Sequence, residues 1–222
     1  RSYAESFLLF RDIFLNRGFN DFFINFRSLR LIDIGSGTAG EIIGFIHAIA
    51  SVFEAPPKLE LTIVDGNRKA VNLAKYIITH TCSLLSIQVD LQIYLKVLRK
   101  SADLESLKAP NTQLYDFVIT SKFINELISA DPKQNTGLYY DFVKHFRESL
   151  SPNGMICLID VTTQSNDAIY FPSLMNFQLN EIEKKDDQLR TVIPLSCHSF
   201  GKECGESCFF GRVINLSHSR CA

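Results

Sequence analysis

The stretch from Arg30 to Gly40, RLIDIGSGTAG, constrains the fold of this chain more than any other. Its first half is an apolar run typical of a buried strand, and its second half carries glycines in the spacing G-x-G-x-x-G, at Gly35, Gly37 and Gly40. Glycines at such a turn permit backbone angles closed to other residues, and the following helix offers unpaired N–H groups. The pattern therefore predicts a strand, a nucleotide-binding turn and a helix, in that order.

After this turn the chain alternates between helical and strand patterns. We expect strands at 31–34, 59–64, 87–94, 115–120 and 155–161, and helices at 41–53, 69–84, 122–129 and 139–150. Five strand–helix units of this kind predict a doubly wound, mostly parallel α/β sheet with helices on both faces. Two further strand patterns, at 189–195 and 208–216, would complete a seven-stranded sheet as an antiparallel hairpin.

The length of 222 residues suits one main domain with a well-buried core. We divide the chain into an N-terminal helical segment, 1–27, and a domain at 28–222 that includes a cysteine-rich hairpin at 194–213. Aromatic and aliphatic residues recur at helical spacing between Phe7 and Phe14. We interpret this stripe as a core-facing helix surface rather than a substrate-binding surface.

Composition excludes some classes of partner. The formal net charge of −1 argues against a domain that holds nucleic acid mainly through excess positive charge. No apolar run approaches the roughly 18 residues that cross a bilayer, and we find no signal peptide, so we expect no membrane partner. Cys82 and Cys157 lie in apolar stretches as core residues, which favours an intracellular, cytoplasmic or mitochondrial, compartment. The chain opens at Arg1 rather than Met. We therefore expect it to be a piece of a larger polypeptide, or part of a complex.

Two acidic residues follow strands of the predicted sheet. Asp65 ends the second strand, where a carboxylate is placed to accept hydrogen bonds from the ribose hydroxyls of a nucleotide. Its alternative role is turn formation, within the sequence Asp65-Gly66-Asn67. Asp103 follows the third strand, and we weigh equally a contact with an adenine amino group and a cap on a short helix at 104–107.

Polar residues also follow the fourth strand, at the sheet edge where open α/β folds bind ligands. Asn125 and Glu126 are candidate substrate contacts and catalytic residues, and Glu126 is the carboxylate that we nominate as a general base. The alternative is that Ser121 caps the helix at 122–129, which would leave Asn125 and Glu126 on a solvated first turn.

Together these stretches resemble the class I S-adenosylmethionine-dependent methyltransferases. The matching blocks are DIGSGTAG at 33–40, VD at 64–65, YDFVITSKFINEL at 115–127 and LSPNGM at 150–155, in the order that the family has them. The resemblance implies a Rossmann-like fold, S-adenosylmethionine as the cofactor and methyl transfer as the reaction. Amino-group methyltransferases have an Asn-Pro-Pro-Tyr-like tetrad, which this chain lacks.

The resemblance also implies roles for individual residues. The loop that contains Gly35, Ser36, Gly37 and Gly40 would lie against the methionine part of the cofactor, and Asp33 would organise this loop. Asp65 would bind the ribose hydroxyls and Asp103 the adenine, while Ser121 would lie at the strand end that faces the transferred methyl group.

Cysteines gather near the end of the chain, at Cys197, Cys204 and Cys208. Three thiolates at short spacing can hold zinc, or an iron–sulfur cluster if a fourth ligand joins them. The spacing C-x6-C-x3-C is not a standard zinc-finger pattern, and free cysteines in a loop are an equal alternative. The segment 194–213 also resembles the last hairpin of mitochondrial small-ribosomal-subunit methyltransferase-like assembly factors, some of which are thought to carry an iron–sulfur cluster and to act in ribosome assembly.

Two functions are consistent with these patterns. The first is an active S-adenosylmethionine-dependent methyltransferase whose acceptor, a small molecule, protein or RNA, is not assigned. The second is a non-catalytic methyltransferase-like module that binds RNA or protein and carries a metal or iron–sulfur site in its cysteine-rich hairpin.

Overall fold

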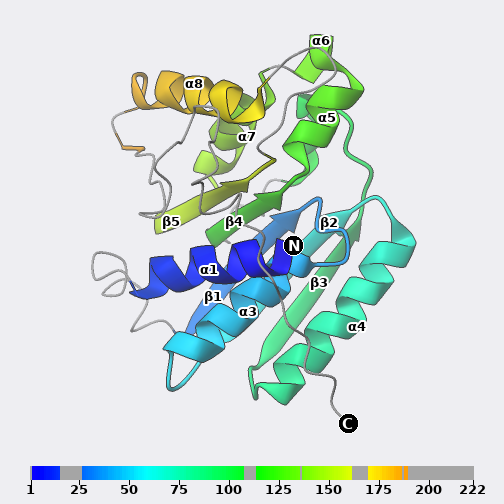
Figure 1. The fold of residues 1–222 in the computed structure, drawn as a ribbon, viewed down its shortest axis with the longest axis vertical. Helices are drawn as coiled ribbons and strands as arrows, with labels where there is room; N and C mark the ends of the chain where they lie inside the picture. Colours follow the sequence, from blue (N-terminus) through cyan, green and yellow to red (C-terminus); the bar gives the residue numbers. More distant parts are fainter. Residues whose placement is uncertain are drawn as a thin grey trace, which may run out of the picture.

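The structure is a computed structural model that describes residues 2–15, 27–107, 114–135, 137–161, 170–186 and 188–189 (Figure 1). The strands are β1 (Ser28–Ile34), β2 (Lys58–Asp65), β3 (Val89–Leu95), β4 (Tyr115–Ser121) and β5 (Leu150–Ile159). The helices are α1 (Ser2–Leu15), α3 (Gly40–Val52), α4 (Arg68–Leu84), the 3-10 helix η1 (Ser101–Leu107), α5 (Ile124–Ala130), α6 (Pro132–Asn135), α7 (Leu138–Arg147) and α8 (Phe171–Glu183). The five predicted strands and four predicted helices are all present, with ends that differ by a few residues.

The five strands form one parallel sheet in the order β3-β2-β1-β4-β5. The chain runs outward from β1 to β3 and then crosses to β4 on the other side of β1, as in the Rossmann type of doubly wound fold. The predicted α/β class with a parallel sheet is therefore confirmed. The antiparallel hairpin lies almost wholly outside the described residues, so the count of seven strands stays a prediction.

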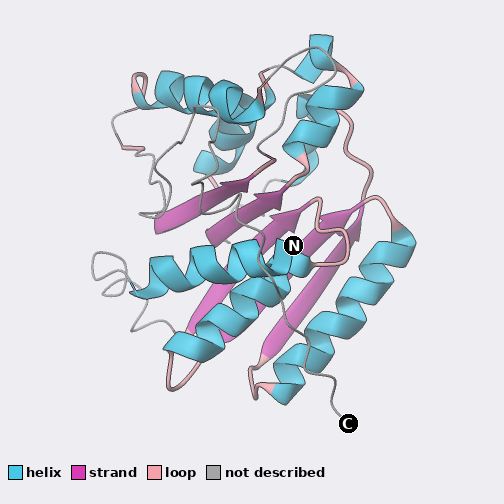
Figure 2. Cartoon of the chain, viewed as in Figure 1, coloured by secondary structure: helices cyan, strands magenta, loops and turns pink. Residues whose placement is uncertain are grey.

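Helices cover both faces of the sheet (Figure 2). Alternate strand residues point to opposite faces, so Leu31 and Phe117 join a core with α1, α3 and α4, while Ile32 and Val118 join a core with α5, α7 and α8. Continuous apolar runs in the central strands are what such two-sided burial requires.

Helix α1 crosses α3 at very short range. A Cβ atom built on Gly44 would lie 2.5 Å from the backbone oxygen of Tyr3, and one on Gly40 would lie 3.3 Å from Ser2 Cβ. Further along α1, the ring centroids of Phe10 and Phe45 are 4.7 Å apart in an edge-to-face contact. The absence of side chains at the two glycines thus lets the first turn of α1 lie against the start of α3.

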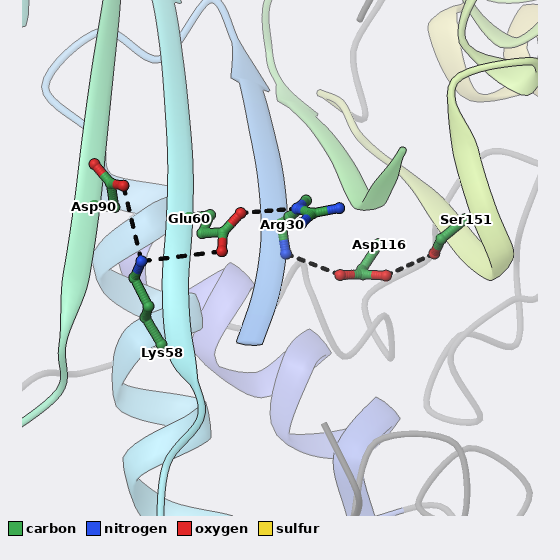
Figure 3. A network of polar contacts seen from close by, with 6 residues as sticks. All are labelled: Arg30, Lys58, Glu60, Asp90, Asp116 and Ser151. Atoms are coloured by element: carbon green, nitrogen blue, oxygen red, sulfur yellow. Dashed lines mark hydrogen bonds and ion pairs between the residues drawn. The ribbon is translucent and has the colours of Figure 1, made fainter. Parts of the chain in front are cut away.

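A chain of polar contacts crosses the sheet at the amino-terminal ends of its strands (Figure 3). On one side, Arg30 Nε donates to Glu60 Oε2 at 2.7 Å. On the other, Asp116 accepts from the Arg30 backbone N–H at 2.8 Å and from Ser151 Oγ at 2.6 Å. The carboxylate of Asp116 therefore ties β4 to both of its neighbours.

The pairing of β4 with β5 is interrupted near its start. Tyr115 pairs with Leu150 and Phe117 with Met155, so residues 151–154 loop out of the ladder. This loop holds the Pro-Asn-Gly sequence that predicted a break before the fifth strand, and Asn153 takes a left-handed φ of 65°. The strand itself begins at Leu150, earlier than the predicted residue 155.

Candidate active site

The candidate site lies at the carboxyl ends of β1 and β4, where the chain reverses its direction of travel across the sheet. After β1, the backbone enters the left-handed region at Gly35 (φ 74°), Gly37 (φ 49°) and Ala39 (φ 62°). Glycine adopts this region without steric cost, which explains two of the three predicted loop glycines. Gly40 is the first residue of α3 and serves the contact with α1.

The amide groups of this loop are mostly used within the protein. Gly35 and Ser36 N–H both donate to the Val64 carbonyl, at 2.9 and 3.3 Å, and Ala39 N–H donates to the Ser36 carbonyl at 2.6 Å. Gly37 N–H donates to Asp65 Oδ2 at 2.9 Å. The loop is therefore not the open cradle of N–H groups that the glycine pattern suggested, although a Cβ on Gly37 would meet no atom within 4 Å.

Phe123 occupies the space next to the first glycine. A Cβ atom on Gly35 would lie 2.5 Å from both Cβ and Cγ of Phe123. This close approach is made by a side chain of the protein itself, so Gly35 is required for packing as well as for its left-handed conformation.

Two carboxyl groups are buried beside the loop. Asp33, in β1, is fully buried, and neither of its oxygens has a hydrogen-bond partner of good geometry in the described structure. Burial, followed by the neighbouring Glu41 carboxyl, raises the pKa of Asp33 well above its usual value. Burial likewise raises the pKa of Glu41, in the first turn of α3, to about 7. The pair therefore holds a proton or a positive charge more readily than exposed carboxylates do.

Asp65 links β2 to the glycine loop. Besides the bond from Gly37, its Oδ1 atom accepts from Asn67 N–H at 2.7 Å, and Asn67 in turn caps α4. The alternative of a turn-forming aspartate is thus observed. A carboxylate has about four acceptor sites, so these two bonds leave capacity for ribose hydroxyls.

Ser121 does not cap the following helix. It is the last residue of β4, and α5 begins at Ile124 without a side-chain cap, because Lys122 takes a left-handed φ of 58° and redirects the chain. The buried Oγ atoms of Ser121 and Ser36 have no hydrogen-bond partner among the described residues. The capping alternative is therefore wrong, and the end of β4 and the glycine loop each carry a buried hydroxyl group.

Lys122 reaches across to the first helix. Its Nζ atom donates to Glu5 Oε2 at 2.5 Å and lies 3.3 Å from Ser2 Oγ. The positive charge of Lys122 also lowers the pKa of Glu41. Lys122, which follows β4, thus interacts with Glu5 of α1 and with Glu41 of α3, so these three elements meet at one site.

Asn125 and Glu126 differ in their surroundings. The Asn125 backbone N–H donates to Asp160 Oδ2 at 3.2 Å, and its side-chain nitrogen, turned toward its acceptors, donates to Asp160 Oδ1 and to the Lys122 carbonyl, both at 2.6 Å. Tyr139 donates to the same carboxylate at 2.6 Å, and burial raises the pKa of Asp160 to about 6. Asn125 thus fastens the turn after β4 to the end of β5, whereas Glu126 is exposed.

Asp103 lies in η1 and accepts from the backbone N–H groups of Arg99, at 2.7 Å, and Lys100, at 3.1 Å. These bonds lower the pKa of Asp103, with the Arg99 bond making the largest contribution. Asp103 therefore closes the turn before η1, and the adenine contact stays a prediction.

The predicted metal ligands Cys197, Cys204 and Cys208 lie outside the described residues, so the metal site also stays a prediction. Within the described ranges, no group of three or more histidine, cysteine, aspartate or glutamate side chains could hold a metal ion. Cys82 and Cys157 are buried and free, as predicted for core residues. None of the helices described is long and apolar enough to span a bilayer.

Three acidic residues of this region were not predicted as part of the site from the sequence: Glu5, Glu41 and Asp160. For Glu41 a signal existed, because an acid one residue after the last loop glycine must lie in the first turn of the helix. For Asp160, the position at the end of the fifth strand was the available signal.

No protein-family model matches this chain, and no curated protein matches its sequence. Among solved structures, it is similar to MnmC2 from Aquifex aeolicus, with 12% identity over 82% of this chain and 55% of that chain, at a TM-score of 0.49. The methyltransferase subunit of a type I restriction–modification system from Streptococcus thermophilus has 14% identity, coverage of 79% and 37%, and a TM-score of 0.45. CrArsM, an arsenic(III) S-adenosylmethionine methyltransferase from Chlamydomonas reinhardtii, has 16% identity, coverage of 58% and 37%, and a TM-score of 0.37.

This chain spans about half the length, or less, of these solved proteins. Because the identities and TM-scores are low, we base the function on the residues of the site itself.

Proposed function

We propose that this chain binds S-adenosylmethionine at the carboxyl ends of β1 and β4, and that it transfers the methyl group to an acceptor. The observation that carries the proposal is the buried pair of Asp33 and Glu41 beside the glycine loop. Asp65 and Glu5 add two more carboxyl groups nearby, and Lys122 is the cation that the described residues contribute.

The charge of the site favours one class of nucleotide over another. S-adenosylmethionine carries a positive sulfonium and a positive ammonium group, which two buried carboxyl groups would stabilise. A nicotinamide dinucleotide carries a negative pyrophosphate, which needs free N–H groups at the loop and helix start. Here four of the loop amides are already bonded and acidic groups surround them. The residues present therefore fit S-adenosylmethionine better than NAD.

Each residue of the site has a defined task in this proposal. Asp33 and Glu41 hold positive charge at the loop, and Asp65, fixed by its bonds with Gly37 and Asn67, accepts from the ribose. The hydroxyls of Ser36 and Ser121 donate to polar groups of the cofactor. The bound cofactor supplies an electrophilic methyl group on its positively charged sulfur, so positioning of the acceptor provides much of the catalysis. The exposed Glu126 remains our candidate base.

Isothermal titration calorimetry with S-adenosylmethionine, S-adenosylhomocysteine and NAD tests the proposal. We expect both adenosyl compounds to bind and NAD not to bind. Asp33→Asn and Asp65→Ala should each weaken S-adenosylmethionine binding by tenfold or more, since each removes a carboxyl group that the proposal assigns to the cofactor. Asp90→Asn, on the exposed face of β3, is the matched control and should leave the affinity unchanged.

Failure of the wild-type protein to bind S-adenosylmethionine, or preferential binding of NAD, would overturn the proposal. Binding without methyl transfer to small-molecule, protein or RNA acceptors would instead support the non-catalytic alternative.

A further inference from the structure

The buried carboxyl groups of Asp33 and Glu41, which flank the glycine loop in the sequence, interact directly with each other. Asp33 lies near the carboxyl end of β1 and is fully buried, and Glu41 lies in the first turn of α3 and is 4% exposed. A hydrogen bond between the two side chains favours the protonated form of Asp33 and the ionised form of Glu41. Such a bond needs a proton on one of the two groups, because an ionised carboxylate has acceptors and no donor.

The surroundings of the two groups decide which of them carries the proton. No donor of good geometry among the described residues reaches either carboxyl oxygen of Asp33. Burial, followed by the charge of Glu41, raises the pKa of Asp33. Burial also raises the pKa of Glu41, to about 7, but the backbone N–H of Glu41 and the positive charge of Lys122 oppose that rise. Asp33 is therefore the donor, and Glu41 the acceptor, of a shared proton.

Charged residues from three other elements act on this pair or on its neighbours. Besides burial, the negative charge of Asp65 at the end of β2 raises the pKa of both acids. Lys122, after β4, is the cation that acts on Glu41, and it already forms an ion pair with Glu5 of α1. Two adjacent buried carboxylates need a positive charge close to them. In the part of the chain that the structure describes, the shared proton supplies much of that charge.

We propose that Asp33 and Glu41 share one proton in the free protein and release it when S-adenosylmethionine binds. This inference rests on the proposed function and adds a proton exchange to it. In the free protein the O–H group of Asp33 donates to the Glu41 carboxylate. On binding, that O–H bond breaks and the proton passes to the solvent, which leaves two carboxylates beside the ammonium and sulfonium groups of the cofactor. A positive charge within about 4–6 Å favours the ionised form of a carboxyl group, so the cofactor need not touch Asp33 itself.

The exchange makes the affinity for the cofactor depend on pH. Because the proton and the cofactor compete for the pair, the dissociation constant should fall as the pH rises, by roughly three- to tenfold between pH 6 and pH 7. The pKa of an α-amino group is about 7.7–8.0, so the ammonium group of the cofactor keeps its charge in this range. A site of permanently ionised carboxylates would bind the cofactor equally well at both pH values.

Infrared spectroscopy of the protein without cofactor tests the shared proton. At pH 8 exposed carboxyl groups are ionised, so the carbonyl band of a protonated carboxyl group can come only from a buried acid. We expect this band in the wild-type protein and in the control Asp90→Asn, which changes an exposed aspartate, and we expect Asp33→Asn to lose it. Absence of the band from the wild-type protein would overturn the proposal, whether or not the cofactor binds.

Isothermal titration calorimetry with S-adenosylmethionine tests the exchange. Titrations in phosphate and imidazole buffers, which take up protons with different heats, count the protons released on binding. At pH 6 and pH 7 we expect the wild-type protein and Asp90→Asn to release about one proton for each cofactor bound, and Asp33→Asn to release fewer. Far-ultraviolet circular dichroism should show that both variants are folded, and the wild-type titrations decide the outcome even if Asp33→Asn is not.

The outcomes separate this proposal from the proposed function. Binding by the wild-type protein without proton release, with equal affinity at both pH values, or with the same proton release in Asp33→Asn would overturn the exchange and leave the proposed function standing. Absence of binding at both pH values would overturn both.

Discussion

Lys122 Nζ donates to Glu5 Oε2 across 2.5 Å, although the two residues are 117 positions apart in the sequence. Lys122 begins the turn that carries the chain out of β4, and Glu5 lies in the first turn of α1. The contact joins the amino-terminal helix to the candidate site at a point where Glu5 is nearly buried and Lys122 is 23% exposed. Helix α1 is therefore part of the site rather than an independent appendage.

Glu5→Gln should lower the free energy of unfolding by roughly 1–3 kcal/mol, because it removes the carboxylate that pairs with the partly buried charge of Lys122. Urea denaturation measures this loss. Glu60→Gln, which removes the more exposed ion pair with Arg30, is the control and should cost less than about 1 kcal/mol. Equal losses of unfolding free energy in the two variants would show that the Glu5–Lys122 ion pair stabilises the fold no more than an exposed ion pair does.

Gly44→Val should separate α1 from α3. The added side chain would meet the Tyr3 backbone oxygen, and backbone at 2.5 Å gives way only if the helix moves. We expect a loss of roughly 2–4 kcal/mol in the free energy of unfolding, together with faster amide hydrogen exchange throughout α1. Gly137→Ala, where the nearest atom is 4.0 Å away, should change stability little. Unchanged exchange in α1 would contradict the packing described here.

The buried acids predict how stability depends on pH. The pKa of Glu41 is about 7 in the folded chain, against an ordinary value of 4.5 for a glutamate, so between these two pH values the folded chain holds a proton that the unfolded chain has lost. The free energy of unfolding should therefore fall as the pH rises from about 4.5 to about 7, and Asp33 adds to the fall.

Glu41→Gln should reduce this fall by roughly 1–3 kcal/mol, measured by urea denaturation at pH 5 and pH 8. Glu54→Gln, which changes an exposed glutamate, is the control and should keep the wild-type slope. A pH profile of Glu41→Gln that matches wild type would show that Glu41 does not titrate in this range.

Tyr139→Phe should loosen the turn after β4. It removes the hydroxyl group that donates to Asp160, at a cost of about 1–2 kcal/mol in unfolding free energy. Because that bond lowers the pKa of Asp160, the substitution should also raise this pKa above its present value of about 6. Carboxyl carbon-13 titration by nuclear magnetic resonance measures the shift, and a lower pKa would contradict the assigned role of Tyr139.

Much of the fold follows from local patterns in the sequence. The strands and helices were predictable because apolar runs, alternation and glycine or proline breaks each report on a few neighbouring residues. The aromatic stripe of α1 was also interpreted correctly, since Phe10 and Phe14 are fully buried in the core. The start of the helix after β4 was predicted wrongly, at residue 122 instead of Ile124. The sequence does not reveal that Lys122 adopts a left-handed conformation, which delays the start of α5.

The site was harder to predict than the fold. The glycine spacing located the loop, yet which way its amides point depends on the Val64 carbonyl and the Asp65 carboxylate, which approach from β2. The partnership of Lys122 with Glu5 depends on the crossing of α1 and α3, and no local pattern encodes a contact over such a separation. Asn125 was predicted as a catalytic residue because it follows a strand, and that role stays a prediction. What the sequence does not reveal is that Asn125 bridges Asp160 and the Lys122 carbonyl.

The interruption between β4 and β5 has a consequence at the opposite end of the strand. Because side chains alternate along a strand, gaining or losing one residue would exchange the two faces of everything that follows. Asp116 lies within this interruption and is anchored to Arg30 and Ser151 on either side. These anchors therefore set the phase of β4, and with it the face on which Ser121 emerges five residues later.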